Sequence, residues 1–478
     1  MKNSKVLKAG LGYTIGNYLL KGLSFISIPI YTRLLSTSNY GAFNNFLTYE
    51  SIFFIILGCA IHSSYNSAHY KYEINATNSA KGKDYYTYAS TTTIFILISA
   101  VIWLFLTNIF YKTLINWLEI DRFSLNLLVI YSAAAALITC FNYDVSINYE
   151  YKKFLAVSGF NAISTILISI LLLLTLFDHK RYMGMIIGAS VPSILASIYV
   201  VFYFFKRAKP KNFFYFLKWG LRYSLPIVPN GLSQVVLNQF DRIMITKLVS
   251  LAATGIYSFA YNIYSILAVT FNSLDSVWTP WFYKQMKNKN YKAIKKYSSL
   301  YICLMFIFTA GVILISPELI MILGQRNYWL AKYTVIPVVA GGYFAFLYTI
   351  PVVVEYYYSK TGWIALGTSI AAVVNIVLNW LFIPRFGYIA AAYSTLVTYI
   401  LYFLFHFFIA RKIHGSALFS TKVILACSIG VLFISLLSRL FVEIIIIRWL
   451  IAISLATIFI VYEEKKYGFI KKKLGDIK

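Results

Sequence analysis

The segment Thr32-Arg33-Leu34-Leu35-Ser36 is followed by Gly41, and the segment Thr246-Lys247-Leu248-Val249-Ser250 is followed by Gly255 at the same spacing. Each copy ends the first of six successive apolar stretches of about 20 residues, the length that spans a bilayer as a helix. Because six is an even number, the two copies share one orientation across the membrane. The repeat therefore predicts two related six-helix lobes.

The whole chain has the composition of a membrane protein. Of its 478 residues 60% are hydrophobic and 12% are charged, and the mean hydropathy is +0.70, whereas soluble domains carry about 25% charged residues. We predict an all-α, polytopic membrane protein with about 14 transmembrane helices, near residues 11–35, 42–65, 88–110, 124–147, 155–177, 183–205, 223–248, 254–280, 297–316, 333–355, 363–383, 387–410, 419–438 and 444–462. The predicted parts are an N-terminal lobe at 1–206, a C-terminal lobe at 207–412, and two further helices with a basic cytoplasmic tail at 413–478.

Most of the basic residues lie in the tails and in the loops that connect the predicted transmembrane helices. The chain has 43 Lys and Arg against 16 Asp and Glu, a net charge of +27, and most of the basic residues fall in the two tails and the even-numbered connections. Because Lys and Arg accumulate in cytoplasmic loops, we predict that both termini are cytoplasmic. Charge scattered over loops favours contact with anionic membrane lipids and argues against nucleic acid as a partner.

Motifs for catalysis and for metal binding are missing from the sequence. It contains no Walker phosphate loop, no H-E-x-x-H and no nucleophile elbow, and its four Cys and five His are dispersed. The predicted outer connections are short and leave no room for an external catalytic domain. The sequence therefore predicts a protein that is not an enzyme, with no catalytic residue, no metal site and no cofactor.

Four basic residues fall inside the first and seventh apolar segments: Lys21, Arg33, Arg242 and Lys247. A charge within hydrocarbon is costly and usually faces a partner or a water-filled cavity. Polar residues at helical spacing accompany them: Asn17 on the first segment, and Asn230, Gln234 and Asn238 on the seventh. We predict that these eight side chains bind an anionic substrate. Snorkelling to the interface is the alternative for the four basic residues, most of all for Arg33 and Lys247.

Three carboxylates inside the predicted spans are candidates for coupling transport to protons or sodium ions: Glu50, Asp241 and Asp275. Alternatively, Asp241 neutralises Lys21 or Arg242. Two other carboxylates, Asp144 and Glu355, are close enough to the cytoplasmic boundary for us to expect them to be solvated.

Three stretches carry a family resemblance: Lys21–Phe25 through Pro29 and Thr32–Leu35 to Tyr40–Gly41; Tyr223–Pro226 through Asp241–Arg242 to Gly255–Ser258; and Leu381–Pro384 with Phe386–Gly387 and Ala390–Ala392. Through them the chain resembles the Wzx-type O-antigen flippases, of the polysaccharide transporter family in the MOP (multidrug/oligosaccharidyl-lipid/polysaccharide exporter) superfamily. The resemblance covers essentially the whole length.

This resemblance implies a MATE-like fold and a flippase of the bacterial inner membrane. Such a protein would move an undecaprenyl-pyrophosphate-linked oligosaccharide, an O-antigen or similar repeat unit, from the cytoplasmic to the periplasmic leaflet by alternating access. The implied partners are the lipid-linked oligosaccharide, membrane lipids, and the polysaccharide polymerase and chain-length machinery. Two alternatives remain: a cation-coupled multidrug exporter of the same superfamily, for which the basic Lys21 and Arg242 are unfavourable, and a membrane glycan polymerase, which needs a longer outer loop.

Overall fold

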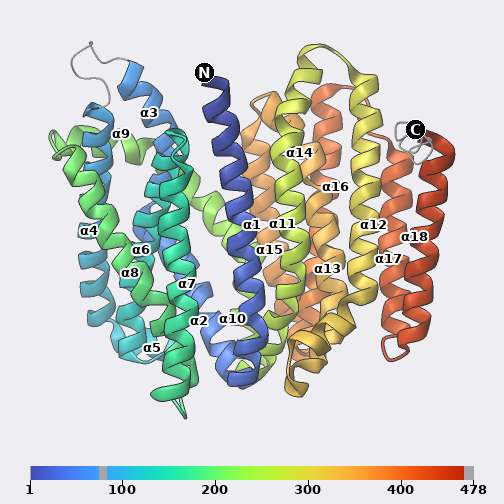
Figure 1. Cartoon of the computed structure of the whole chain (residues 1–478), viewed down its shortest axis with the longest axis horizontal. Helices are drawn as coiled ribbons and strands as arrows, with labels where there is room; N and C mark the ends of the chain where they lie inside the picture. The colour runs from blue at the N-terminus through green and yellow to red at the C-terminus, as the bar shows by residue number, and fades with distance from the viewer. Residues whose placement is uncertain (1, 75–82, 468–478) are drawn as a thin grey trace. The chain divides into compact units, whose positions relative to one another are not determined.

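The chain folds into helices. The computed structural model describes the backbone of residues 2–74 and 83–467, and every regular element within these ranges is helical. The chain divides into two compact units, Met1–Gly255 and Ile256–Lys478, the first coloured blue to green and the second green to red (Figure 1). The basic tail beyond Tyr467 lies outside the described residues.

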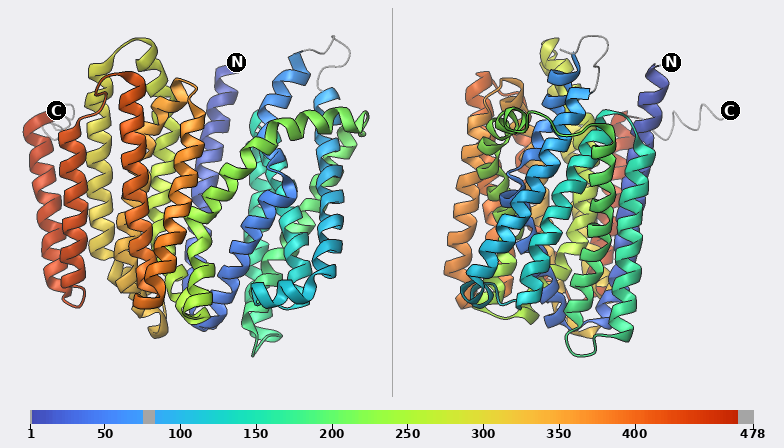
Figure 2. Two further views of the ribbon diagram at one scale, coloured as in Figure 1. Left: turned by 180° about the vertical axis from the view of Figure 1, so that it is seen from behind. Right: turned by 90° about the vertical axis from the view of Figure 1, so that its left-hand side faces the viewer.

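The first unit contains α1 (Lys2–Leu34), α2 (Thr37–Gly58), η1 (Ile61–Ser64), α3 (Tyr65–Ile74), α4 (Lys83–Ile109), α5 (Tyr111–Leu118), α6 (Arg122–Ile147), α7 (Tyr151–Thr175), α8 (Arg181–Arg207), α9 (Phe213–Ser224), η2 (Leu225–Ile227), α10 (Val228–Leu248) and the first turn of α11 (Leu251–Lys287). The short helix α9 lies crosswise to the long helices of this unit (Figure 2).

The second unit contains the rest of α11, followed by α12 (Tyr291–Leu323), η3 (Arg326–Ala331), α13 (Lys332–Leu347), α14 (Thr349–Tyr357), α15 (Thr361–Phe386), α16 (Tyr388–His414), α17 (Thr421–Leu440) and α18 (Ile445–Tyr467). The last two helices lie side by side (Figure 2) and both pack against α12.

Each of the 14 predicted segments lies on one helix or on two or three successive helices. Within the described residues, nine helical stretches are long and apolar enough to cross a membrane, or ten if the bent pair of α2 with Ile61–Tyr72 is one span. Three of the remaining helices, α1, α10 and α11, do not meet this test although they are long. The prediction of an all-α polytopic membrane protein is confirmed, and α1 and α10 are the helices that carry the predicted substrate residues.

Local signals account for the breaks between helices. Ser36 caps α2 by accepting a hydrogen bond from the backbone N–H of Asn39 at 3.2 Å. At the other end of α2, Cys59 and Ala60 have φ values of 47° and 49°, a left-handed conformation that stops a helix. The chain consequently bends by 55° before the next helix.

The tenth predicted segment is broken near its centre into α13 and α14. Pro351 has no N–H to donate to the carbonyl of Leu347, four residues earlier, which is where α13 ends. The helix restarts at Thr349 as the nine-residue α14.

Candidate functional site

A polar seam joins α2 and α10 in the first unit. The Nδ2 atom of Asn45 donates to Oγ1 of Thr246 at 2.8 Å, and the Nε2 atom of Gln239 donates to Oγ of Ser51 at 3.1 Å. Side-chain hydrogen bonds between apolar helices fix their register, because an unpaired polar group in hydrocarbon is costly. The seam therefore holds α10 firmly against α2.

The two glycines of the sequence repeat meet at the end of this seam. A Cβ built on Gly41 would lie 2.9 Å from the backbone N of Gly255 and closer still to the carbonyl O of Leu251. Reciprocally, a Cβ on Gly255 would lie 3.1 Å from the backbone N of Gly41 and closer to the carbonyl O of Thr37. The start of α2 and the start of α11 thus cross backbone to backbone, which only glycine permits.

Burial divides the predicted residues on α10. Asn230, Gln234 and Arg242 are half-buried and Asn238 is exposed, whereas Asp241 is 1% exposed. The Nδ2 atom of Asn238 donates to the carbonyl O of Gln234 at 2.8 Å, and the Arg242 guanidinium donates to the carbonyl O of Asn238 at 3.4 Å. These side chains therefore form a continuous polar strip along α10, with Asp241 turned inward.

The predicted residues on α1 lie on its open surface. This helix packs along α7, where the Oη atom of Tyr13 donates to the carbonyl O of Val145 at 2.8 Å. Asn17 and Lys21 are both exposed, and among the described residues Lys21 has no ion-pair partner. Arg33 is also exposed, and its guanidinium donates to the carbonyl O of Pro29 at 3.5 Å.

Lys247 has a partner that the sequence did not suggest. Its Nζ atom lies 2.6 Å from Oε1 of Glu119, in the connection between α5 and α6. Glu119 also lines a pocket of about 190 Å³ in the first unit, together with Ser38, Asn39, Ala42, Asn45, Leu118, Ile120, Tyr182, Ile186 and Leu251. Of the four predicted cations, Lys247 is thus already neutralised beside a pocket of mixed polarity.

The three predicted coupling carboxylates lie in different surroundings. Glu50 is half-buried on α2, next to Ser51 of the polar seam, and Asp241 is buried on α10. Asp275 is half-buried on α11 in the second unit. Glu50 and Asp241 thus lie on the packed helix pair α2 and α10, whereas Asp275 lies on α11 in the second unit.

The expectation that Asp144 and Glu355 are solvated is wrong, because both are 0% exposed. Asp144 accepts hydrogen bonds from Oη of Tyr203 at 2.7 Å and from Nδ2 of Asn148 at 3.1 Å. Glu355 pairs with His406, which is also 0% exposed. Neighbouring helices cover the ends of α6 and α14, which proximity to a predicted boundary does not reveal.

Sequence reasoning also missed a buried ion pair. Arg448 on α18 is 2% exposed and binds the carboxylate of Glu318 on α12. The signal available was a basic residue within the last apolar segment, where a charge needs a partner. This pair ties the final helix to α12.

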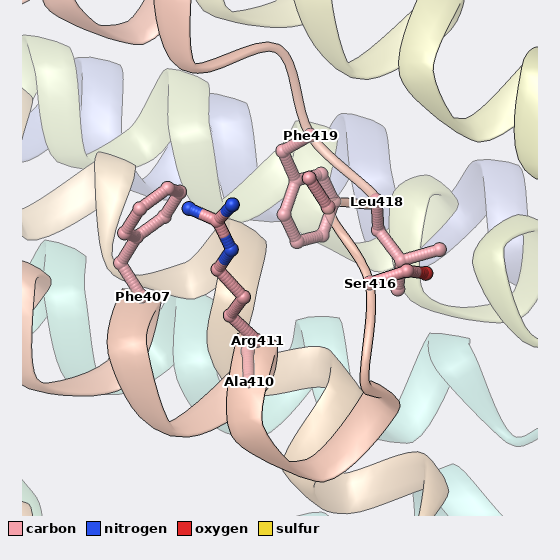
Figure 3. Close-up of a pocket in the computed structure, with 7 residues that line it drawn as sticks. Phe407, Ala410, Arg411, Ser416, Leu418 and Phe419 are labelled. Carbon is pink, nitrogen blue, oxygen red and sulfur yellow. The ribbon is translucent and has the colours of Figure 1, made fainter.

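A second pocket, in the second unit, is too small for a large substrate. The C-terminal end of α16 and the following loop enclose about 10 Å³, with the Arg411 guanidinium beside the ring of Phe407 and across from Phe419 (Figure 3). This volume is about that of one water molecule. Within residues 2–74 and 83–467, no group of three or more His, Cys, Asp or Glu side chains could hold a metal ion.

Comparison with known proteins identifies a family and a relative of this chain. Residues 6–286 match the family described as polysaccharide biosynthesis protein. The Lsg locus protein 1 of Haemophilus influenzae is 23% identical over 418 residues, which cover 84% of this chain and 98% of that protein.

Two solved structures are similar along most of the chain. The lipid II flippase MurJ, in an inward closed conformation, has a TM-score of 0.72 at 16% identity and covers 95% of this chain and 99% of its own. An inward-facing multidrug resistance MATE family transporter of the MOP superfamily has a TM-score of 0.64 at 13% identity and covers 83% and 96%. The chain therefore has the MATE-like fold that the sequence predicted.

Proposed function

Because this chain belongs to the polysaccharide biosynthesis protein family, we propose that it is a flippase for a lipid-linked oligosaccharide. The substrate we propose is an undecaprenyl-pyrophosphate-linked O-antigen or similar repeat unit, moved from the cytoplasmic to the periplasmic leaflet of the bacterial inner membrane. The protein would have both termini in the cytoplasm, as the distribution of basic residues favours. A lipid-linked substrate is also what the structurally similar lipid II flippase is named for.

The observation that carries this proposal is the exposed Lys21 on α1. By the helical rise, it lies about 20 Å from the Leu34 end of the helix. No described residue neutralises its ammonium, and Asn17 is exposed one turn away. An exposed cation midway along a helix of a membrane protein suits a diphosphate, because a charge at membrane depth needs a counter-charge.

The polar strip on α10 supplies the other half of the proposed binding surface. Its amides Asn230, Gln234 and Asn238 suit sugar hydroxyls, and Arg242 suits phosphate. Alternating access between lobes at 1–206 and 207–412 would carry this surface from one side to the other. Glu50, Asp241 and Asp275 stay our candidates for carboxylates that bind a coupling cation such as sodium.

The test replaces Lys21 or Arg242 with Ala in the native host. We expect loss of surface glycan at unchanged abundance of the protein in the membrane. The matched control is Arg222→Ala, an exposed cation at the end of α9, which should leave glycan display intact. Normal glycan display in both variants would remove Lys21 and Arg242 from the mechanism.

A second candidate function, cation-coupled drug export, is favoured by the likeness to the MATE transporter. The two functions differ in the charge of the cargo. A drug exporter should protect cells from cationic dyes, and Lys21→Ala should improve or preserve this protection because it removes a like charge. Dye resistance together with normal surface glycan in a deletion strain would favour export of drugs over flipping of lipid.

A further inference from the structure

Glu355 on α14 and His406 on α16 form an isolated buried pair in the second unit. The Nδ1 atom of His406 lies 2.6 Å from Oε1 of Glu355, and both side chains are 0% exposed. The outer atoms of the pair, Oε2 of Glu355 and Nε2 of His406, find no hydrogen-bond partner among the described residues. Each side chain therefore depends on the other for its polar contact.

The net charge of this pair depends on how many protons its two side chains share. With one proton the pair is neutral overall, either as carboxylic acid with imidazole or as carboxylate with imidazolium. Without a proton it is a net anion, and with two protons it is a net cation. Because an unbalanced buried ion costs several kcal/mol, burial favours the neutral arrangement with one proton.

The groups that face the pair do not replace either partner. Three of them are tyrosines: Tyr402 on α16, whose ring lies 4.7 Å from that of His406; Tyr348, between α13 and α14, whose ring lies 5.9 Å from that of His406; and Tyr356 on α14. The fourth is the more distant carboxylate of Asp275 on α11, which lies within electrostatic range of Tyr348 and Tyr356. From α15, Thr368 shares a hydrogen bond of 2.8 Å with Tyr402. In the part of the chain that the structure describes, His406 alone lies within ion-pair distance of Glu355.

The backbone of α15 approaches the imidazole closely at Gly367. A Cβ built on Gly367 would lie 2.9 Å from Nε2 of His406. This contact leaves the buried imidazole without room for a water molecule on that side. Proton exchange therefore requires the helices around the pair to separate.

The other buried pair of this unit lacks the same chemistry. Arg448 keeps its proton at every physiological pH, so its pair with Glu318 cannot release one. Histidine, in contrast, changes charge between about pH 5 and 8. Of the two pairs, that of Glu355 and His406 alone can take up and release a proton.

Glu355 lies on α14, four residues after Pro351, and a single residue, Tyr348, separates this helix from α13. Proline leaves the carbonyl of Leu347 without its helical N–H donor, so a helix can bend at this point. A change of this bend would draw Glu355 away from His406 and admit water. We propose that this pair is the proton-binding site that couples transport to a pH gradient, with one proton per cycle; this inference rests on the proposed flippase function.

The test uses the purified full-length protein in liposomes. The probe is an undecaprenyl-pyrophosphate disaccharide with a fluorescent label, the membrane potential is clamped at zero, and the pH differs by one unit across the membrane. With one coupled proton, the steady-state distribution of the probe between leaflets should shift about tenfold. Glu355→Gln and His406→Gln should still equilibrate the probe, at a ratio near one with or without the gradient.

Two further variants separate coupling from structure. The exchange Glu355→His with His406→Glu retains the pair and should restore the shift. Glu318→Gln disrupts the other buried pair, so it should lower stability yet retain the tenfold response. A wild-type protein that equilibrates the probe without regard to pH, or a full response in Glu355→Gln and His406→Gln, would overturn the proton site and leave the flippase function intact.

Failure of the wild type to move the probe would instead reject the flippase function. A readout without lipid then decides on the site itself. On unfolding at pH 8, the detergent-solubilised wild type should release about one proton more than Glu355→Gln, and the exchanged pair should regain this release. Equal proton release in these three proteins would reject the site.

Discussion

The crossing of α2 and α11 predicts the effect of Gly41→Ala. The added methyl group would lie 2.9 Å from the backbone N of Gly255 and closer to the carbonyl O of Leu251. Ordinary Cβ contacts begin at 3.4 Å, and backbone atoms cannot rotate away as a side chain can. The two helices must therefore separate, and overpacking of this kind lowers the free energy of unfolding by about 1–3 kcal/mol.

Gly159→Ala is the matched control, because Gly159 is also helical and a Cβ there has no heavy atom within 4 Å. Removal of a glycine at such a position stabilises a protein by about 0.4–1 kcal/mol. Denaturant titration of the purified protein in detergent, followed by Trp fluorescence, should separate the two variants by about 1.4–4 kcal/mol. Equal stability of Gly41→Ala and Gly159→Ala would refute the backbone crossing.

Three further changes test other contacts. Arg448→Met should lower the free energy of unfolding by about 3–5 kcal/mol, because it leaves the Glu318 carboxylate buried and unpaired; denaturant titration measures this. Tyr203→Phe removes the hydroxyl that donates to a buried carboxylate at 2.7 Å, which should cost about 1–3 kcal/mol in the same titration. Hydrogen bonds from Lys332 and a neighbouring tyrosine lower the pKa of Glu443, in the turn before α18, so its contribution is present above the unfolded pKa of about 4.3 and is lost as the pH falls through the lower folded value.

Each change has a control and a contrary outcome. Adding Glu318→Leu to Arg448→Met should recover stability, because it removes the unpaired carboxylate; no recovery would contradict the ion pair. Tyr199→Phe, on the exposed side of α8, should be neutral beside the Tyr203 variant. Glu443→Gln should abolish the acid-side loss, which for a pair this exposed is at most about 1 kcal/mol, and an unchanged pH profile would show that the turn contributes nothing.

The helices and their approximate limits could be predicted from the sequence, because apolar runs of about 20 residues are a local property. The breaks were harder to predict. The left-handed pair Cys59 and Ala60 ends α2 in the middle of the predicted segment 42–65, and neither residue is a glycine or a proline. Pro351 did carry a readable signal for the break between α13 and α14.

The charged residues show the limit of local reasoning more clearly. Lys247 was predicted to bind substrate or to snorkel, yet it pairs with Glu119, 128 residues away in sequence. Lys21 is exposed, and its predicted role in binding substrate stays a prediction. Exposure depends on which helices pack alongside, and the period of one helix does not carry this information.

By itself, the sequence determined that this chain is a bundle of apolar helices with a repeated first helix and a few polar strips. Only the tertiary structure decided which ionisable groups are isolated and which are paired, as for Glu355 with His406 and Glu318 with Arg448. The physical reason is that helix formation in a membrane follows from local hydrophobicity and backbone hydrogen bonding. The state of a buried charge depends instead on partners that arrive from distant helices.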